Sequence, residues 1–382
     1  MQRRLLILGS TGSIGESALD VAAALGPSCR VVGLGARRRW REMAEQIRRF
    51  AVHDAALSED DAAESLRGAS LNGTRIRGGS RALVELVEQT DADFVLSAIV
   101  GAAGLPATLA AVERGLTIGL ANKESLVVAG SILMPLAERT GSKLLPVDSE
   151  HSAVFQALRS GRREEVRRVV LTASGGPFRS WERSRIEHAT VAEALKHPTW
   201  QMGPKITIDS ATMMNKALEV IEACWLFQLP PEQVEVVVHP ESIVHSMVEF
   251  CDGSIIAQLG APDMRTPIQY ALTYPLRADA CGERLNWSEL RQLNFSAPDL
   301  ERFPCLSLGY EAARRGGNAG AVLNASNEVA VEAFLEGRIR FGDIHRLAAR
   351  SLQTQPLQRD PTLDELLACD ARVRQEVRQW IC

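Results

Sequence analysis

The sequence lacks any apolar stretch close to the roughly 20 residues that a membrane-spanning helix needs. At the N-terminus, the apolar run Leu5–Leu8 stops at Gly9, which is shorter than the roughly 7–15 apolar residues of a secretory signal. We therefore expect a buried strand at this position, and a cytoplasmic protein without a membrane partner.

Paired cysteines and an excess of charge of one sign are also missing. The seven cysteines are scattered, and no two have C-x-x-C spacing, so neither a disulfide framework nor a zinc site is expected. The 43 basic and 47 acidic residues give a net charge of −4. This near balance argues against nucleic acid as the main partner.

What is present is the pattern of an α/β protein of 382 residues, long enough for about two or three domains. In residues 1–147, short apolar runs alternate with helical stretches such as Ser17–Leu25 and Arg41–Arg49. Buried strands separated by helices predict a parallel sheet covered on both faces. The expected strands are Leu5–Leu8, Arg30–Leu34, Phe94–Ile99, Thr117–Ala121 and Lys143–Val147.

The pattern changes at residue 148. Residues 148–274 predict a central α+β domain, and Cys251-Asp252-Gly253 predicts a hairpin between its last two strands. Residues 275–303 predict a connector, and residues 304–382 a helical bundle. The strands expected in the central domain are Val169–Thr172, Val234–His239, Ile243–Val248 and Ser254–Leu259. The helices expected in the bundle are Leu306–Arg315, Ala319–Leu335, Gly342–Thr354 and Leu363–Ile381.

A glycine loop, Gly9-Ser-Thr-Gly-Ser-Ile-Gly15, lies between the first strand and the first helix. Glycines there allow the backbone to approach a pyrophosphate, and the helix N-terminus offers amide donors. The G-x-x-G-x-x-G spacing also suits a plain tight turn, but its place after the first strand favours dinucleotide binding. Arg37, Arg38 and Arg39 follow the second strand, where an NAD-preferring domain carries an acid. Guanidinium groups there could hold a 2′-phosphate, which favours NADPH, although a solvated start of the next helix would have the same composition. Residues 1–147 are therefore expected to form a Rossmann-like NADPH-binding domain.

Asp148 and Glu150 follow the fifth expected strand. In an extended segment, residues i and i+2 point the same way, and oxygen ligands without a His/Cys cluster suit Mg²⁺ or Mn²⁺. A surface pair of acids is the alternative.

The segment from His197 to Glu219 carries the densest set of polar groups. A helix is expected from Ser210 or Ala211, with Asp209 or Ser210 as its N-cap. Asn215, Lys216 and Glu219 would then share one helical surface, as a metal or phosphate site or as an ordinary ion pair. The segment 197–205 suits a lid over a substrate or a rigid loop. A further turn, Thr172-Ala-Ser-Gly-Gly-Pro177, could form an anion-binding nest.

Several long motifs together resemble the 1-deoxy-D-xylulose 5-phosphate reductoisomerase family over the whole chain. The matching segments are the glycine loop, Asn122-Lys-Glu-Ser125, Val147-Asp-Ser-Glu150, 172–177, 197–205, 209–219, His239-Pro-Glu-Ser-Ile-Val-His-Ser-Met247 and Leu259-Gly-Ala-Pro-Asp-Met-Arg-Thr-Pro267. At Arg37–Arg39 the family typically has a Gly-Lys-Asn-like segment, so the chain departs from the pattern there while keeping positive charge.

The resemblance implies conversion of 1-deoxy-D-xylulose 5-phosphate to 2-C-methyl-D-erythritol 4-phosphate, with NADPH and Mg²⁺, Mn²⁺ or Co²⁺, by a homodimer. It implies that the metal ligands are Asp148, Glu150 and Glu219. The implied substrate-binding residues are Lys123, Ser149, Glu150, Ser174, His197, Trp200, Met202, Ser210, Asn215, Lys216 and Glu219. The implied NADPH contacts are Thr11, Gly12, Ser13, Ile14, Asn122, Glu124 and Gly203, with Arg37–Arg39 beside the ribose. Lys123, Asp148, Glu150 and Glu219 would be the catalytic residues, and residues 148–274 the α+β catalytic domain.

Two other functions fit parts of the pattern. One is another metal- and NADP-dependent dehydrogenase, such as a decarboxylating hydroxyacid enzyme, which would release CO₂. The other is a non-catalytic NADPH-sensing module whose helical tail binds a partner, which would bind NADPH without oxidising it.

Overall fold

The computed structural model describes residues 2–69, 71, 73–200 and 202–381. The chain forms two compact units, and each of them is discontinuous in sequence. Unit 1 contains residues 1–125, 133–149 and 263–283, and unit 2 contains residues 126–132, 150–262 and 284–382. Within the described part of the chain, no helix has the length and apolar character needed to cross a membrane.

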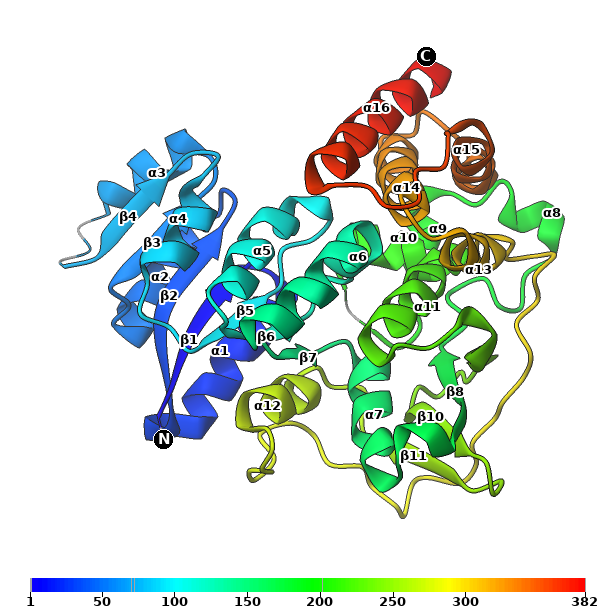
Figure 1. Cartoon of the computed structure of the whole chain (residues 1–382), viewed down its shortest axis with the longest axis horizontal. Helices are drawn as coiled ribbons and strands as arrows, with labels where there is room; N and C mark the ends of the chain where they lie inside the picture. The colour runs from blue at the N-terminus through cyan, green and yellow to red at the C-terminus, as the bar shows by residue number, and fades with distance from the viewer. Residues whose placement is uncertain (1, 70, 72, 201, 382) are drawn as a thin grey trace. The chain divides into compact units, whose positions relative to one another are not determined.

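Unit 1 is built on a seven-stranded sheet with the strand order β4-β3-β2-β1-β5-β6-β7 (Figure 1). All of its neighbouring strands are parallel, as the sequence predicts. The strands are β1 (Arg3–Leu8), β2 (Cys29–Ala36), β3 (Asp54–Leu57), β4 (Arg75–Gly78), β5 (Phe94–Ser97), β6 (Thr117–Leu120) and β7 (Leu144–Pro146). The sequence did not predict β3 and β4, because each is only four residues long and begins with a charged residue.

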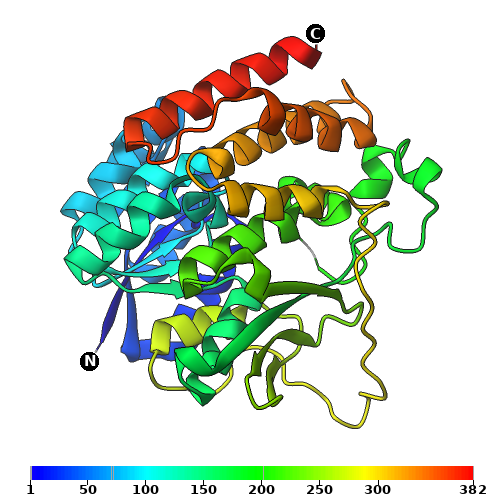
Figure 2. The ribbon, with the colours of Figure 1, turned by 45° about the vertical axis from the view of Figure 1, so that its right-hand side comes forward.

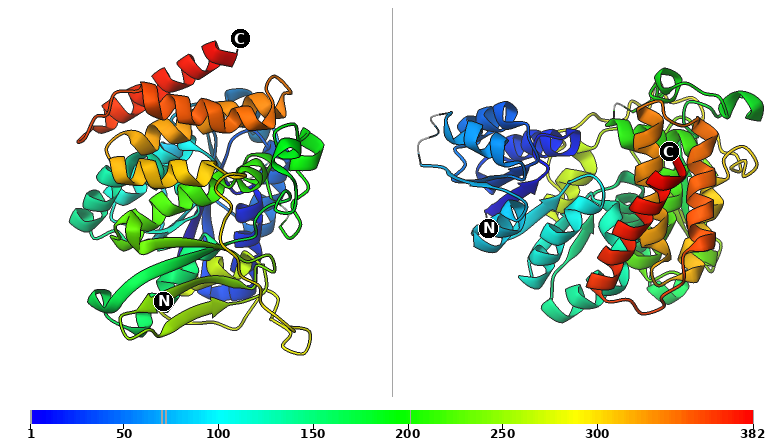
Figure 3. Two further views of the ribbon diagram at one scale, coloured as in Figure 1. Left: turned by 90° about the vertical axis from the view of Figure 1, so that its right-hand side faces the viewer. Right: turned by 90° about the horizontal axis from the view of Figure 1, so that it is seen from above.

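Helices of unit 1 connect these strands and pack on the sheet, with α1 against α12 and α4 against α5 (Figure 3). They are α1 (Ser13–Leu25), α2 (Trp40–Phe50), α3 (Asp60–Arg67), α4 (Ala82–Gln89), α5 (Leu105–Glu113) and α12 (Arg265–Thr273), and α6 (Lys123–Thr140) follows β6. The strand order reverses beside β1, which lies between β2 and β5. In parallel sheets, ligands bind outside the carboxyl ends of the strands at such a switch point.

Unit 2 contains a four-stranded mixed sheet with the order β11-β10-β8-β9. Its strands are β8 (Val166–Ala173), β9 (Val234–Val238), β10 (Val244–Phe250) and β11 (Ile255–Leu259). The predicted hairpin is confirmed: β10 and β11 are antiparallel, and Gly253 has a φ of +86° in the turn between them. β8 and β9 are parallel, so the central sheet is only partly antiparallel.

Nine helices of unit 2 lie within the described residues. They are α7 (Ser149–Ala157), α8 (Arg183–Ile186), α9 (Val191–Ala194), α10 (Pro204–Thr212), α11 (Met214–Phe227), α13 (Cys305–Arg315), α14 (Ala319–Leu335), α15 (Phe341–Thr354) and α16 (Leu363–Ile381). The four predicted C-terminal helices are all present, and α14 contacts both α15 and α16. Helix α11 lies between the sheet and the C-terminal helices, contacting β9 on one side and α13 on the other (Figure 2).

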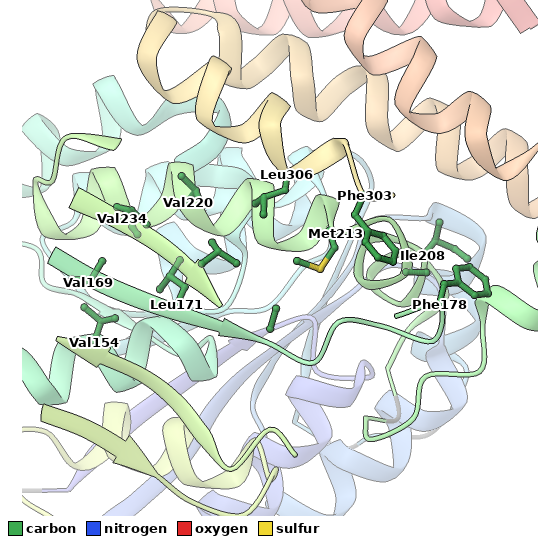
Figure 4. Packing of buried hydrophobic residues seen from close by; sticks show 14 of the residues in the cluster. Val154, Val169, Leu171, Phe178, Ile208, Met213, Val220, Val234, Phe303 and Leu306 are labelled. Atoms are coloured by element: carbon green, nitrogen blue, oxygen red, sulfur yellow. The ribbon is translucent and has the colours of Figure 1, made fainter. Parts of the chain in front are cut away.

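The largest apolar cluster of unit 2 joins these layers (Figure 4). Val169 and Leu171 of β8 face Val220 of α11, and Leu306 of α13 completes the contact; all four are at most 1% exposed. Burying a side chain of this size contributes about 1.5–3 kcal/mol. The packing therefore fixes α11, which carries several of the predicted site residues, against a rigid sheet.

Candidate active site

The glycine loop follows β1 at the switch point of the unit 1 sheet. The amide groups of Gly9 and Ser10 donate to the Gly35 carbonyl at 2.7 and 3.0 Å. A Cβ on Gly9 would lie 2.4 Å from the Ala98 oxygen, and one on Gly15 would lie 2.3 Å from the Gly9 oxygen. Close backbone packing therefore requires glycine at both ends of the loop.

Helix α1 begins directly after this loop, at Ser13 rather than at Ser17, where the sequence analysis began it. Gly12 is its N-cap and has no side-chain cap. The first amide groups of the helix thus point toward the loop, and together with the positive end of the helix dipole they suit a pyrophosphate. The predicted NADPH contacts Thr11, Gly12, Ser13 and Ile14 all lie on this turn.

The three arginines after β2 have different surroundings. Arg39 donates to the Thr11 carbonyl at 2.6 Å, and Arg37 pairs with Glu59 at 2.8 Å. The Arg38 side chain makes no hydrogen bond or ion pair within the described part of the chain. Of the three, Arg38 is therefore the one whose guanidinium group is available for a ligand phosphate, while Arg39 braces the glycine loop.

Asn122 caps α6 and joins two loops at the carboxyl edge of the sheet. It is 1% exposed; its Oδ1 accepts from the Ser125 amide at 3.1 Å, and its Nδ2 donates to the Gly101 carbonyl at 2.9 Å. Its neighbours Lys123 and Glu124 are buried as well. Asn122, a predicted NADPH contact, therefore also holds the start of α6 against the loop after β5, which the sequence motif did not indicate.

The predicted metal ligands form one group of carboxylates. Asp148, Glu150 and Glu219 each offer an oxygen atom, and these atoms all lie within 4.8 Å of one another. Three hard oxygen ligands without thiolate or imidazole fit Mg²⁺ or Mn²⁺ better than zinc. Glu219 is fully buried, and an acid in that position needs a cation or hydrogen-bond donors.

The geometry that brings Asp148 and Glu150 together corrects the sequence prediction. An extended D-x-E segment was expected, but α7 begins at Ser149. Glu150 is therefore in the first turn of a helix, and Asp148 immediately precedes it. The strand ends at Pro146, and the negative side chain of Glu150 near the helix N-terminus suits the dipole.

Lys216 is the buried cation beside this group. Its Nζ lies 2.7 Å from Glu150 Oε1, and it also pairs with Glu219. Burial by itself lowers the pKa of Lys216, but the negative charges of Glu150 and Glu219 outweigh it, so the net pKa is raised. Asn215 donates to the other oxygen of Glu219. Lys216 therefore stays charged and orients two of the three acids.

The helix that carries these residues starts later than predicted. Instead of a helix from Ser210 capped by Asp209, the chain forms α10 and α11, separated at Met213. Met213 has a φ of +62°, a left-handed conformation that is strained for a residue with a side chain. Asp209 therefore lies inside α10 and is not an N-cap. The expected common surface of Asn215, Lys216 and Glu219 on α11 is confirmed by their contacts.

Ser174 and His197 contact each other in the predicted anion-binding turn. His197 Nδ1 accepts from the amides of Thr199 and Trp200 at 3.2 and 2.9 Å. The ring proton is therefore on Nε2, which donates to Ser174 Oγ at 3.0 Å. Ser174 Oγ also accepts from the Gly176 amide at 3.2 Å. The Ser174 hydroxyl hydrogen is left to donate to a ligand.

His197 is neutral at pH 7. Burial lowers its pKa to about 4, with a smaller contribution from the positive charge of Arg179. Ser210 is adjacent to the same turn, because a Cβ on Gly176 would lie 2.8 Å from the Ser210 carbonyl oxygen. Three of the predicted substrate residues, Ser174, His197 and Ser210, thus surround one small-residue turn.

The predicted lid runs from His197 to Lys205, and within it Gln201 lies outside the described residues. The Trp200 ring packs near His245 with 6.5 Å between ring centroids. Trp200 and Met202 are partly buried, Gly203 is exposed, and α10 starts at Pro204. The last two lid residues are therefore helical rather than loop.

Comparison with known proteins assigns the family. A model described as 1-deoxy-D-xylulose 5-phosphate reductoisomerase matches residues 5–130, its C-terminal domain matches residues 144–227, and a DXP reductoisomerase C-terminal domain matches residues 259–376. The 1-deoxy-D-xylulose 5-phosphate reductoisomerase of Chloroherpeton thalassium is 51% identical over 379 residues, which cover 98% of this chain and 97% of that protein. The chain belongs to the 1-deoxy-D-xylulose 5-phosphate reductoisomerase family.

Solved structures of reductoisomerases agree over the whole chain. The enzyme from Zymomonas mobilis in complex with NADPH is 43% identical with a TM-score of 0.93, covering 100% of this chain and 99% of that one. A reductoisomerase in complex with NADPH, fosmidomycin and magnesium is 41% identical with a TM-score of 0.94, covering 100% of this chain and 98% of that one. The reductoisomerase fold therefore extends over both units.

Sequence reasoning missed one buried pair beside the metal ligands. His151 and Glu222 are both fully buried, with 3.4 Å between His151 Nδ1 and Glu222 Oε2. His151 Nε2 lies 3.0 Å from the Glu219 carbonyl oxygen. The only local signal was the adjacency of His151 to Glu150 and the i, i+3 spacing of Glu219 and Glu222.

Proposed function

We propose that this chain converts 1-deoxy-D-xylulose 5-phosphate into 2-C-methyl-D-erythritol 4-phosphate, with NADPH as reductant and Mg²⁺, Mn²⁺ or Co²⁺ as the metal. The observation that carries the proposal is the group of carboxylates formed by Asp148, Glu150 and Glu219, the last two of which pair with Lys216, in a chain of this family. The conversion rearranges the carbon skeleton of the sugar phosphate and reduces the resulting aldehyde, and it belongs to isoprenoid precursor synthesis.

The metal would be held by Asp148, Glu150 and Glu219, whose oxygen atoms are close enough to share one ion. When bound, such an ion is a Lewis acid that polarises a substrate carbonyl and stabilises negative charge on the adjacent oxygen. Lys123, which pairs with Asp148, and Ser149 would contact the hydroxyketone end of the substrate. Their charge and hydroxyl group would orient that end next to the carboxylates.

The phosphate of the substrate would bind at the turn around Gly176. Ser174 supplies a hydroxyl donor, His197 keeps that hydroxyl oriented, and Ser210 lies against the same turn. Asn215 and Lys216 would complete the set. A phosphate gripped far from the reacting carbons contributes binding energy that can be used for lid closure and exclusion of water, and Trp200 and Met202 are the apolar lid residues suited to cover the substrate.

NADPH would bind at the switch point of the unit 1 sheet. The α1 N-terminus would receive the pyrophosphate through Thr11, Gly12, Ser13 and Ile14. Arg38 would hold the ribose 2′-phosphate, and Arg39 would support the loop through Thr11. Asn122, Glu124 and Gly203 complete the proposed contacts. NADPH supplies the hydride that reduces the rearranged aldehyde.

The proposal includes the organisation of the protein. Residues 1–147 would bind NADPH, residues 148–274 would bind metal and substrate under the lid 197–205, residues 275–303 would connect, and residues 304–382 would form the C-terminal helical domain. The protein would act in the cytoplasm as a homodimer, without a nucleic-acid or membrane partner.

The test follows NADPH absorbance with the purified chain, Mg²⁺ and 1-deoxy-D-xylulose 5-phosphate. One NADPH should be consumed for each sugar phosphate, and the product should be 2-C-methyl-D-erythritol 4-phosphate by NMR. Release of CO₂, or NADPH binding without oxidation, would contradict the proposal.

A further inference from the structure

A chain of three side chains, of which Asp209 and Asn327 are buried, connects the end of the lid to the C-terminal helices. Lys205 Nζ lies 2.7 Å from Asp209 Oδ2, one helical turn further along α10. Asp209 Oδ1 accepts from Asn327 Nδ2 of α14 at 2.8 Å. Asp209 is 1% exposed and Asn327 is not exposed at all. The two residues are 118 positions apart in sequence.

The charge of Asp209 determines how the Asn327 amide is oriented. Its Nδ2 faces the carboxylate, because the opposite orientation would bring two oxygen acceptors together. In this orientation Asn327 Oδ1 is buried and lacks a hydrogen-bond partner in the described part of the structure. An unsatisfied buried carbonyl is destabilising, whereas a hydrogen bond to a charged group is among the stronger ones. The orientation with Nδ2 toward Asp209 is therefore the more favourable of the two.

The contact between Asp209 and Asn327 lies next to the predicted lid and the predicted phosphate-binding turn. Lys205 is the last residue of the lid 197–205, and Ser210 immediately follows Asp209. On another side of α10, the Ser210 carbonyl lies against Gly176 of the anion-binding turn. Helix α10 also contacts α14. The helix is therefore held between the turn that would bind phosphate and the C-terminal helical domain.

We propose that Asn327 and Asp209 are positioning residues for substrate binding. Asn327 fixes the Asp209 carboxylate, Asp209 fixes Lys205, and the pair sets the end of the lid and the orientation of Ser210 toward the substrate phosphate. This inference rests on the proposed function. It gives helix α14, which is far in sequence from the predicted substrate residues, a role in substrate binding.

Helix α14 provides its own matched control. Asn324 is also fully buried, its Nδ2 also donates to a carboxylate, Glu328 at 2.9 Å, and its Oδ1 likewise lacks a partner in the described residues. Asn324→Leu and Asn327→Leu are therefore the same change in the same helix, and they differ in the contact with Asp209. Asp209→Asn is the isosteric change at the other end of this contact.

The experiment measures kcat and KM for 1-deoxy-D-xylulose 5-phosphate, with Mg²⁺ and saturating NADPH, in the wild type, N324L, N327L, D209N and the double variant D209N/N327L. Thermal unfolding of each is followed by circular dichroism. In N327L we expect KM to rise about tenfold or more, as for loss of a hydrogen bond to a charge, with a smaller change in kcat. N324L should lower Tm without raising KM. N327L removes the hydrogen-bond donor, and D209N removes the charge that strengthens the same hydrogen bond, so the effects of the two changes should be less than additive in the double variant.

Equal KM values in N324L and N327L would overturn the inference, and so would additive effects of D209N and N327L. If N327L does not fold, D209N alone decides: a normal KM in folded D209N would overturn the positioning role. Failure of the proposed function is distinguishable, because the wild type would then consume no NADPH.

Discussion

Lys216 of α11 and Glu150 of α7 form a buried ion pair, with 2.7 Å between the ammonium nitrogen and the carboxylate oxygen. The Lys216 side chain is 3% exposed, and the same ammonium group pairs with Glu219. One lysine therefore compensates two acids on two helices of unit 2. A divalent cation bound by Glu150 and Glu219 would either supplement the positive charge of Lys216 or compete with Lys216 for these carboxylates.

Replacing Lys216 should make the fold depend on the metal. In Lys216→Met, Glu150 and Glu219 lose their buried cation, a change that typically destabilises a protein by about 3–5 kcal/mol. Adding Mg²⁺ should restore part of this, because a ligand that binds only the folded state raises Tm. We expect a larger Tm increase with Mg²⁺ in K216M than in the wild type, measured by differential scanning calorimetry. The exposed Lys196 gives the control K196M, and an equal response of K216M and the wild type to Mg²⁺ would show that Mg²⁺ does not replace the charge of Lys216 at these acids.

Glu219→Gln should separate chemistry from cofactor binding. The amide keeps the volume of the side chain but removes a negative ligand from the metal group, while the NADPH loop belongs to unit 1. We expect kcat to fall at least about 100-fold and the Kd for NADPH, measured by fluorescence, to stay within about twofold of the wild type. Nearly normal turnover in E219Q would remove this residue from the metal site.

The three arginines after β2 should contribute to cofactor binding in different ways. Arg38→Ala removes a guanidinium group that would hold the 2′-phosphate, so KM should rise about tenfold for NADPH and little for NADH. Arg39→Ala removes the hydrogen bond to the Thr11 carbonyl, which supports the loop for either cofactor, so KM should rise for both. Steady-state kinetics with the two cofactors tests this. If R38A and R39A changed the ratio of the KM for NADPH to the KM for NADH equally, the assignment would be contradicted.

His197 makes stability depend on acidity. Its pKa is lowered from 6.5 to about 4 in the folded chain, mainly by burial. Between these pH values the unfolded chain binds a proton that the folded chain does not. The stability that the neutral His197 allows is therefore fully present above pH 6.5 and is lost as pH falls toward 4. His197→Gln cannot bind that proton. Its Tm should therefore fall less than that of the wild type between pH 7 and pH 4.5, measured by calorimetry, and parallel curves would show that His197 titrates normally.

The sequence predicts the elements whose signals are local. Five strands of unit 1 contain short apolar runs that the sequence reveals, and the Asp252-Gly253 turn predicts the β10–β11 hairpin. Other features depend on the tertiary structure. The separation of α10 from α11 occurs at Met213, where a φ of +62° is imposed on a residue that carries no turn signal. The contact of Asp209 with Asn327 joins helices far apart in sequence, and no local pattern predicts it.

The most direct test of the metal site is a titration of metal-free protein with Mn²⁺, followed by electron paramagnetic resonance. The wild type should bind one ion per chain, and Glu150→Gln and Glu219→Gln should each weaken that binding by at least about tenfold. If the wild type binds no Mn²⁺, or if both variants bind it as tightly as the wild type, Asp148, Glu150 and Glu219 do not form the metal site.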